Sequence, residues 1–310
     1  MLEPLSVGAE EYLSWLAVEK GRSRNTLLAY RRDLASFEQW ASAAGVDPVT
    51  LGPGAIERYL GELRAEGRHP ASLARATTAL RGLYRFWVEE GTLTADPTVD
   101  VRSPKLPRRL PKALEESQAI HLIESVDGTE PVDLRDRALL EVLYGTGARI
   151  SEVVGLSLTD LTGDDGLMRV FGKGSKERVV PIGRPARAAL DRWLGLTGRP
   201  LMEPRRFASK SDSEAVFLNV RGTRLSRQGA WAAVRTRADR VGLGDVVSPH
   251  VLRHSCASHM LAHGADIRVV QEVLGHVSIA TTQIYTRLSQ DHLRSTYERA
   301  HPRAGGVGAR

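Results

Sequence analysis

The sequence of 310 residues has a single cysteine, few aromatic residues and no long apolar run. One cysteine excludes an internal disulfide bond and favours a protein of the reducing cytoplasm. The apolar runs are a handful of residues long, whereas a helix needs roughly 20 apolar residues to cross a bilayer. The beginning, "MLEPLSVGAEEY", has neither the basic region nor the apolar stretch of a signal peptide. We therefore expect a cytoplasmic protein without a membrane partner.

The composition is that of a globular protein, with 42% hydrophobic and 26% charged residues. Its length suits two domains of ordinary size. A net charge of +6 and a pI near 9.7 agree with nucleic-acid binding, and equally with a basic protein whose charges are solvated. Residues 1–100 hold 11 Lys and Arg against 14 Asp and Glu. A DNA-binding surface there must therefore come from the placement of charges.

Apolar residues recur at helical spacing along the first hundred residues. One helix begins at Ser23 or Asn25, and another occupies 70–91, where proline begins it and glycine ends it. With segments 6–20 and 54–66 they predict a small four-helix bundle. Several arginines lie off the apolar stripes or at helix starts, and they are either DNA-binding residues or a solvated surface. These candidates are Arg22, Arg24, Arg31, Arg75, Arg81 and Arg85.

The segment 101–112, "VRSPKLPRRLPK", has three prolines, five basic residues and no acidic one. Proline disfavours a helix or a central strand, so we interpret this segment as a linker between domains 1–100 and 113–310. A basic linker can follow a phosphate backbone and let two domains close around a duplex. Its candidate DNA-binding residues are Lys105, Arg108 and Arg109.

Beyond the linker the pattern mixes helices with one hairpin. In "LMRVFGKGSKERVVPI" (167–182), apolar flanks meet at a Gly-Lys-Gly-Ser-Lys turn, which predicts a β-hairpin. Helices are expected around it at 133–145, 149–156, 185–196, 226–240, 249–263, 266–274 and 289–300. The expected fold class is mainly α with a small β-sheet: an N-terminal four-helix-type bundle and a helix-rich α+β domain.

The run "HVLRHSCASH" begins at His250 and is rich in histidine. His250 and His254 are four apart, the spacing of two metal ligands in a zinc hydrolase. Such an enzyme needs a glutamate after the first histidine, where this chain has Val251, and the cation of Arg253 would repel a metal ion. Cys256 lies off that face and is expected to be buried packing. We therefore favour a phosphate over a metal and predict no metal or other cofactor.

Other motifs supply the remaining parts for breaking a phosphodiester. "GTGARISEV" places Arg149 at a helix start, and "FGKGSKER" places Lys173 at the hairpin tip. "LGHVSIATTQIYTRL" places His276 in a turn and Tyr285 nine residues later. Arginine binds the non-bridging oxygens, a hydroxyl attacks the phosphorus, and an ammonium protonates the leaving oxygen. Carboxylate clusters for two-metal hydrolysis are not evident, so arginines would neutralise the charge.

The sequence resembles the tyrosine site-specific recombinases at six positions in order: Arg149, Lys173, His250, Arg253, His276 and Tyr285. Within that family it is most similar to the bacterial Xer recombinases, of the XerC and XerD kinds. The likeness covers nearly the whole chain, including "GKGSKERVVPIG" and the terminal "AHPRA". The run "HGADIRVVQEVLGH" favours the XerD kind.

The resemblance implies a role for each position. Tyr285 would attack the scissile phosphate, giving a 3′-phosphotyrosyl bond and a free 5′-hydroxyl. Arg149, Arg253 and His276 would cradle the phosphate, and Lys173 would protonate the 5′-oxygen. The first histidine of "HVLRH" would assist proton transfer at the tyrosine.

The resemblance also implies partners: double-stranded DNA with a two-arm site, a tetramer on that DNA, a second Xer recombinase and a cell-division DNA translocase. The implied task is the resolution of chromosome dimers. The alternatives are a phage or transposon integrase, relaxation of DNA like a type IB topoisomerase, and DNA binding without catalysis. All six residues are present, which argues against the last. The lack of an arm-binding domain before the bundle argues against the larger integrases.

The segment after Tyr285, "TRLSQDHLRSTYERAHPRA", has Leu288, Leu293 and Tyr297 at helical spacing. This helix either packs on its own domain or, as the resemblance implies, docks on a neighbouring protomer. In the second case, deletion of residues 288–310 should leave a folded, DNA-binding protein that no longer fills a two-arm site cooperatively.

Overall fold

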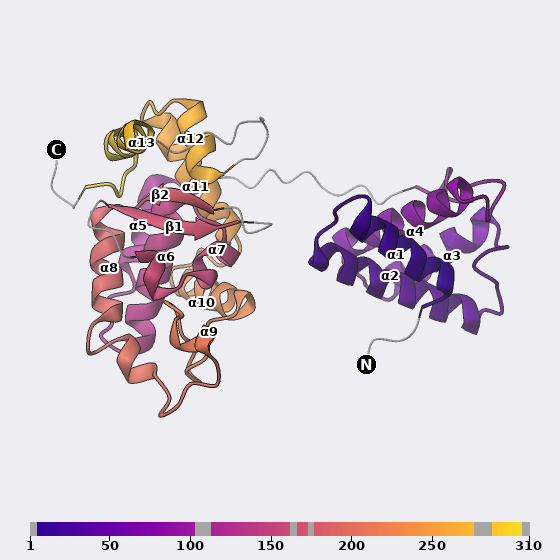
Figure 1. Ribbon diagram of the computed structural model, residues 1–310, viewed down its shortest axis with the longest axis horizontal. Helices are drawn as coiled ribbons and strands as arrows, with labels where there is room; N and C mark the ends of the chain where they lie inside the picture. Colours follow the sequence, from indigo (N-terminus) through magenta and orange to yellow (C-terminus); the bar gives the residue numbers. More distant parts are fainter. Residues whose placement is uncertain (1–4, 103–112, 162–165, 173–176, 276–286, 306–310) are drawn as a thin grey trace. The chain divides into compact units, whose positions relative to one another are not determined.

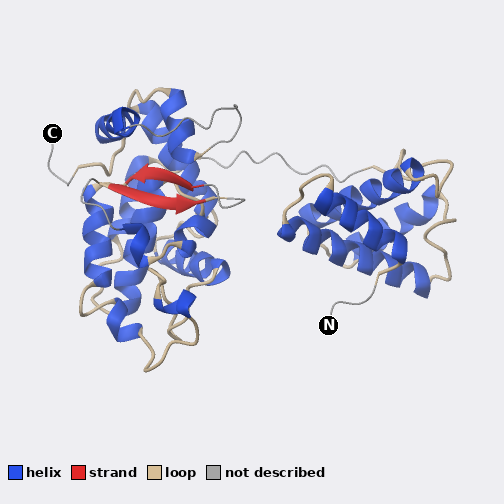
Figure 2. Ribbon diagram, in the orientation of Figure 1, coloured by secondary structure: helices blue, strands red, loops and turns tan. Residues whose placement is uncertain are grey.

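The structure is a computed structural model that describes residues 5–102, 113–161, 166–172, 177–275 and 287–305, with the backbone alone at Pro53 and 287–291. The chain forms two compact units, residues 1–108 and 109–310 (Figure 1). The strands that the structure describes form one two-stranded sheet, and helices make up most of both units (Figure 2). Within the described ranges, no helix is both long and apolar enough to cross a membrane.

The first unit is the predicted four-helix bundle. Its helices are α1 (Val7–Val18), α2 (Arg24–Ala43), α3 (Pro53–Ala65) and α4 (Pro70–Glu89). Ser23 is the N-cap of α2, because its hydroxyl accepts a hydrogen bond of 3.2 Å from the backbone N–H of Thr26. Gly91 follows α4 with a φ of 72°, a left-handed conformation that favours glycine. The apolar faces meet in a core that includes Leu34, Phe37, Ile56, Leu80, Leu83 and Tyr84.

The second unit surrounds a buried central helix. Its helices are α5 (Glu116–Glu124), α6 (Pro131–Thr146), α7 (Ile150–Gly155), α8 (Arg184–Leu194), α9 (Lys210–Ser213), α10 (Arg227–Arg240), α11 (Pro249–Ala262), α12 (Ile267–Leu274) and α13 (Arg287–Ala300). Short 3-10 turns occupy Leu158–Leu161 and Arg199–Met202. Helix α6 is buried along residues 138–146 and packs against α8 and α11. The expected fold class, mainly α with a small β-sheet, is confirmed.

The predicted hairpin is present as β1 (Leu167–Phe171) and β2 (Glu177–Pro181). The strands are antiparallel, with Leu167 opposite Pro181 and Phe171 opposite Glu177. The buried side chains of both strands point to the same core as α6, so this small sheet lies against the helices. The connection 173–176, which carries the predicted Lys173, lies outside the described residues.

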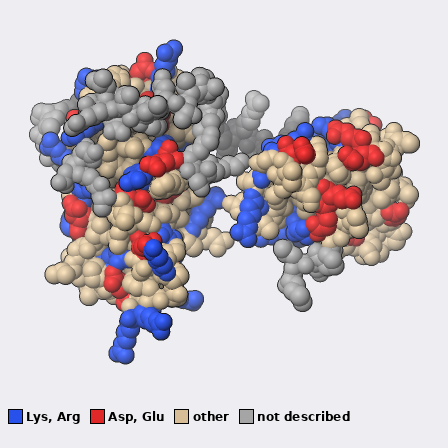
Figure 3. Space-filling model, in the orientation of Figure 1, with Lys and Arg blue, Asp and Glu red and all other residues tan. Residues whose placement is uncertain are grey.

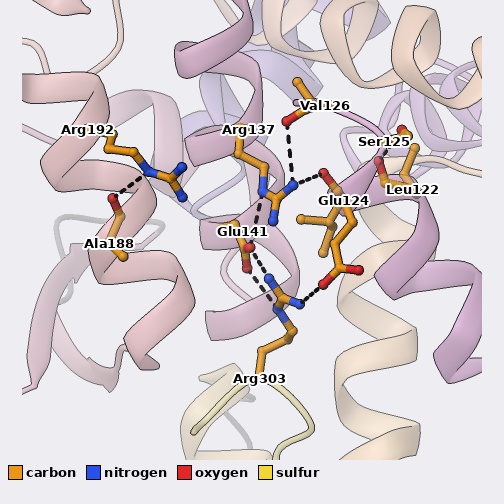
Figure 4. Close-up of polar contacts among 10 residues, drawn as sticks. Leu122, Glu124, Ser125, Val126, Arg137, Glu141, Ala188, Arg192 and Arg303 are labelled. Atoms are coloured by element: carbon orange, nitrogen blue, oxygen red, sulfur yellow. Dashed lines mark hydrogen bonds and ion pairs between the residues drawn. The ribbon is translucent and has the colours of Figure 1, made fainter. Parts of the chain in front are cut away.

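The C-terminal segment packs on its own unit. Leu293 and Tyr297 are 2% and 1% exposed, and the Tyr297 hydroxyl donates to the carbonyl of Gly145 at 2.9 Å. After α13, Arg303 forms ion pairs with Glu141 of α6 and Glu124 of α5 (Figure 4). In the single chain this helix thus packs on its own unit, as the first alternative expects, and docking on a neighbouring protomer stays a prediction. Deletion of residues 288–310 would remove these buried contacts, and the expected loss of cooperative DNA occupancy stays a prediction.

Candidate active site

The structure describes three of the six predicted catalytic residues, namely Arg149, His250 and Arg253. Lys173, His276 and Tyr285 lie outside the described residues. Among the described residues, Arg149 and Arg253 and the elements that hold them define the site.

The turn between α6 and α7 positions Arg149. Helix α6 ends at Gly147, whose φ of 59° is left-handed. A Cβ at Gly147 would lie 2.8 Å from Cδ2 of Leu274 and 3.1 Å from Sγ of Cys256. Position 147 therefore requires glycine for two reasons: the left-handed backbone and the lack of room for a Cβ. Arg149 then becomes the N-cap of α7, and its backbone N–H donates to Oε2 of Glu152 at 2.7 Å.

Arg253 points inward from α11 and is only 9% exposed. Its guanidinium donates to the carbonyl oxygens of Gly147 at 2.7 Å and Leu274 at 2.6 Å. Burial, helped by the charge of Arg149, lowers the pKa of Arg253 to about 10. The side chain therefore stays positively charged at neutral pH. Since a guanidinium has five N–H donors, these two carbonyls leave donors that can bind a phosphate.

The buried carboxylate of Glu152 binds two arginines. Oε1 accepts from Nη1 of Arg149 at 2.9 Å and from Nη1 of Arg178 at 2.7 Å. Oε2 accepts from Nη2 of Arg178 at 2.8 Å. Burial alone would raise the pKa of Glu152, but the hydrogen bonds from Arg178 and Arg149 outweigh it and hold this pKa below its usual range. Glu152 is therefore ionised at neutral pH and fixes Arg149 through both its backbone and its side chain.

Three consecutive carbonyl oxygens at the end of α12 each accept a hydrogen bond from a different arginine. The pairs are Val273 with Arg178 (3.3 Å), Leu274 with Arg253 (2.6 Å) and Gly275 with Arg149 (3.5 Å). A helix C-terminus carries partial negative charge, which favours cations there. The end of α12 thus brings together arginines from β2, α11 and the start of α7, directly before the segment that carries the predicted His276.

The cluster has an excess of positive charge. Arg149, Arg178 and Arg253 face one carboxylate, that of Glu152, so their formal charges sum to +2. The side chain of Arg149 is 41% exposed, whereas those of Arg178 and Glu152 are 8% and 1% exposed. Arg149 is therefore the part of the cluster most open to an anion from solvent. In the described ranges, no group of three or more His, Cys, Asp or Glu is placed to hold a metal ion.

The histidines of α11 separate into exposed and buried ones. His250 and His254 are exposed, and the side chain of His250 has no hydrogen bond or ion pair with any residue that the structure describes. His250 lies three residues before Arg253 on the same helix, and its side chain is exposed while Arg253 is buried. His259 is buried, and its ring bonds the Tyr144 hydroxyl and a backbone carbonyl, each at 2.8 Å. Cys256 is fully buried, as predicted, and burial raises its pKa to about 12.

Three of the six arginine candidates in the first unit bind other parts of that unit. Arg31 pairs with Glu10, and Arg75 binds Asp33 through Nε at 2.8 Å and Nη2 at 3.0 Å. Arg81 donates to a backbone carbonyl. These contacts hold the helices of the bundle together and limit what the three side chains can offer a ligand.

The other three arginines, Arg22, Arg24 and Arg85, are exposed. Their side chains have no hydrogen bond or ion pair with the residues placed by the structure. The face of this unit in Figure 3 mixes basic and acidic side chains, as the composition requires. The linker candidates Lys105, Arg108 and Arg109 lie outside the described residues.

Comparison with known families finds matches over both units. Residues 112–292 match the phage integrase family, and residues 9–91 match the N-terminal SAM-like domain of phage integrases.

Many curated proteins are similar over nearly the whole chain. Tyrosine recombinase XerD of Corynebacterium glutamicum is 46% identical over 305 residues, covering 96% of this chain and 98% of the relative. Tyrosine recombinase XerD of Mycobacterium tuberculosis is 44% identical over 315 residues and covers 98% of this chain and 100% of the relative. The XerD of Halalkalibacterium halodurans is 40% identical with the same coverage.

Solved structures share the fold at low identity. A lambda integrase dimer bound to a COC′ core site has a TM-score of 0.66 at 19% identity, covering 89% of this chain and 98% of that one. The XerH recombinase bound to palindromic difH substrate has a TM-score of 0.65 at 22% identity, covering 94% and 84%. At these identities the likeness concerns the fold.

Proposed function

The chain belongs to the phage integrase family of tyrosine recombinases, and within it to the Xer group; on this premise we propose that Tyr285 is the nucleophile with which it cuts and rejoins DNA. The observation that carries the proposal is the cluster of Arg149 and Arg253 around the end of α12. It supplies positive charge and N–H donors of the kind that bind a phosphate's non-bridging oxygens.

In the proposed reaction the Tyr285 oxygen attacks the phosphorus, and the bond from phosphorus to the 5′-oxygen breaks. Arg149, Arg253 and His276 neutralise the charge of the pentavalent transition state. Lys173 gives a proton to the departing 5′-oxygen, and His250 takes the proton from the phenol. A phenol has a pKa near 10, so it needs such an acceptor and nearby positive charge at neutral pH.

The covalent link explains why strand exchange needs no external energy source. The phosphotyrosyl bond keeps the free energy of the broken phosphodiester, so the 5′-hydroxyl of another strand can reverse the attack. Arginines perform the charge neutralisation in this scheme, and it requires no metal or other cofactor. A metal-activated water would instead hydrolyse the bond and lose the exchange.

We further propose double-stranded DNA with a two-arm site as the substrate. Exchange between two duplexes requires four cut strands, which favours a tetramer. A structure with TM-score 0.66 and 19% identity is described as a lambda integrase tetramer bound to a Holliday junction. The relatives named XerD favour resolution of chromosome dimers in the cytoplasm at cell division, with a second Xer recombinase and a DNA translocase as partners.

The first unit is proposed to be the core-binding domain, which binds the DNA of the site through its own surface. Arg22, Arg24 and Arg85 are its leading DNA contacts, since they are exposed and available. A phage or transposon integrase remains the alternative within the family. Relaxation like that of a type IB topoisomerase is distinguished by a plasmid with a single site, on which relaxation proceeds and recombination does not.

The test is incubation with a nicked dimer-resolution site that traps the covalent intermediate. The wild-type protein should give an SDS-resistant protein–DNA adduct, and Tyr285→Phe should give none. Tyr297→Phe is the matched control, because the Tyr297 hydroxyl is buried against the Gly145 carbonyl and should be dispensable for attack. An adduct that persists in Tyr285→Phe, or is lost only in Tyr297→Phe, would place the nucleophile elsewhere.

A further inference from the structure

Arg178 of β2 is buried in the active-site cluster, and the resemblance to the recombinases gave it no role. Its guanidinium forms a two-bond ion pair with Glu152, at 2.7 and 2.8 Å. We propose that Arg178 is a positioning residue for strand cleavage: it neutralises Glu152, so that Arg149 keeps its positive charge available for the scissile phosphate. This inference rests on the proposed function and concerns how the same site is set up.

The two arginines bind Glu152 in different ways. Arg178 uses both terminal nitrogens, one on each carboxylate oxygen, while the side chain of Arg149 makes one bond of 2.9 Å to Oε1. The Arg178 side chain is 8% exposed and that of Arg149 is 41% exposed. Arg178 is thus placed as the counter-ion, whereas Arg149 gives Glu152 one side-chain bond and the Gly275 carbonyl one bond of 3.5 Å, which leaves it further N–H donors on its exposed side.

The charges show what the loss of Arg178 would do. Without it, the buried carboxylate of Glu152 would keep Arg149 as its one ion-pair partner among the described residues. A buried carboxylate without adequate neutralisation is strongly unfavourable, and opposite charges attract strongly at low dielectric. Arg149 would therefore turn fully onto Glu152, and the formal charge of the cluster would fall from +2 to +1.

Arg178 also fixes the end of α12. Its Nε donates to the carbonyl of Val273 at 3.3 Å. Gly275 is left-handed with a φ of 64°, and a Cβ there would lie 2.9 Å from both Cδ and Nε of Arg178. The arginine stem therefore packs directly against the turn whose Gly275 carbonyl accepts from Arg149 at 3.5 Å. Arg178 thus neutralises Glu152 and also positions the Gly275 carbonyl, and both of these groups bind Arg149.

A purely structural role makes a different prediction, and the chain offers a matched control. Arg224 lies at the other end of α7 and donates to the carbonyls of Gly155 and Leu156, each at 2.8 Å. It supports the same helix but has no contact with Glu152. Arg224→Met should therefore disturb α7 without changing the charge that reaches the phosphate.

The experiment compares cleavage of two nicked substrates under single-turnover conditions. One has an ordinary scissile phosphate, and the other has a methylphosphonate there, in which a methyl group replaces one non-bridging oxygen and removes the negative charge. Arg178→Met should lower the rate on the phosphate about 100-fold, the size of loss expected for one transition-state donor. The rate on the neutral methylphosphonate should fall much less, so the ratio of the two rates changes.

Three further variants sharpen the comparison. Arg178→Lys keeps the charge and should keep the wild-type ratio even where both rates fall. Arg224→Met should lower both rates by the same factor. Adding Glu152→Gln to Arg178→Met removes the carboxylate that captures Arg149, and it should return the ratio toward wild type.

Equal loss on both substrates for Arg178→Met, or no return of the ratio in the double variant, would overturn the proposal. If circular dichroism shows that Arg178→Met is unfolded, Arg178→Gln replaces it with the same expected ratio, because glutamine can hydrogen-bond the carboxylate without neutralising it. A wild-type protein that forms no adduct would refute the proposed function itself. An adduct with an unchanged ratio would refute the role of Arg178 alone.

Discussion

At the scale of single residues, the burial of His301 makes the stability of the folded protein depend on pH. It is 4% exposed and stacks on Tyr297, with ring centroids 4.9 Å apart. Its Nδ1 accepts from the backbone N–H of Arg303 at 3.0 Å, which places the ring proton on Nε2. That atom has no partner among the described residues. Burial, with the charge of Arg303 adding to it, lowers the pKa of His301 to about 3.

We predict that the folded protein loses stability as the pH falls below about 6.5, the usual pKa of histidine in an unfolded chain. Below that pH His301 is protonated in the unfolded chain but stays neutral in the folded protein. The free energy of unfolding therefore falls by up to about 1.4 kcal/mol per pH unit until the pH reaches the pKa of the folded state. Urea denaturation at pH 7 and pH 5 measures this. His301→Gln should show a clearly smaller difference between the two pH values, and an equal difference would assign the effect to other groups.

The arginines of the site should affect chemistry more than binding. Each acts at one phosphate, whereas DNA affinity sums over many backbone contacts. Arg149→Ala and Arg253→Ala should each lower the cleavage rate on the nicked site by about 100-fold or more while site affinity falls little. Arg253→Ala should also lower the melting temperature, because Gly147 and Leu274 lose buried donors. A gel shift that weakens in step with cleavage would make them ordinary backbone contacts.

The roles of Glu152 and Arg178, which support the arginine cluster, could not be predicted from the sequence. Glu152 follows Arg149 by three positions at a helix start, which is the position of a capping glutamate. Such a residue is normally exposed, and nothing local shows that this one is buried between two arginines. Arg178 occupies an inward position of β2, two residues before the buried Val180. Its partner is 26 residues away, so only the tertiary fold reveals the pair.

At the scale of elements, apolar periodicity predicted the long helices and the hairpin because their buried faces are regular. It missed α5 and α9. Helix α5 has nine residues and depends on a local bond from the Glu115 N–H to the Gln118 side chain, at 3.0 Å. Helix α9 is a single turn held by the Ser209 cap. The four residues of α9 include no apolar side chain, so no apolar period can show there.

The segment that follows α13 should contribute to stability through Arg303. Arg303→Met leaves the Glu141 carboxylate, which is 1% exposed, with Arg137 at 3.3 Å as its remaining ion-pair partner in the described chain. Breaking a buried ion pair costs about 3 kcal/mol or more. Chemical denaturation should show that loss for Arg303→Met and little change for Arg299→Met on exposed α13 surface. Equal stability of the two variants would contradict the buried anchor.

At the scale of the whole molecule, the sequence placed two helical regions on either side of a proline-rich basic segment, and the described chain forms two compact units. The sequence alone could not predict which arginine side chains are bound to other residues and which face solvent. Several arginines of the first unit are bound to neighbouring helices. In the second unit, burial and one carboxylate decide that Arg149 faces solvent while Arg178 does not.

The central claim is that Tyr285 forms the covalent link to DNA, and locating that link by mass spectrometry tests it most directly. The trapped adduct is digested with nuclease and trypsin. Trypsin cuts after Arg268 and Arg287, so residues 269–287 form a peptide whose one tyrosine is Tyr285. We predict that this peptide carries the nucleotide through its tyrosine. A nucleotide on another peptide, such as 295–299 with Tyr297, or an unmodified 269–287 in the isolated adduct, would contradict the account.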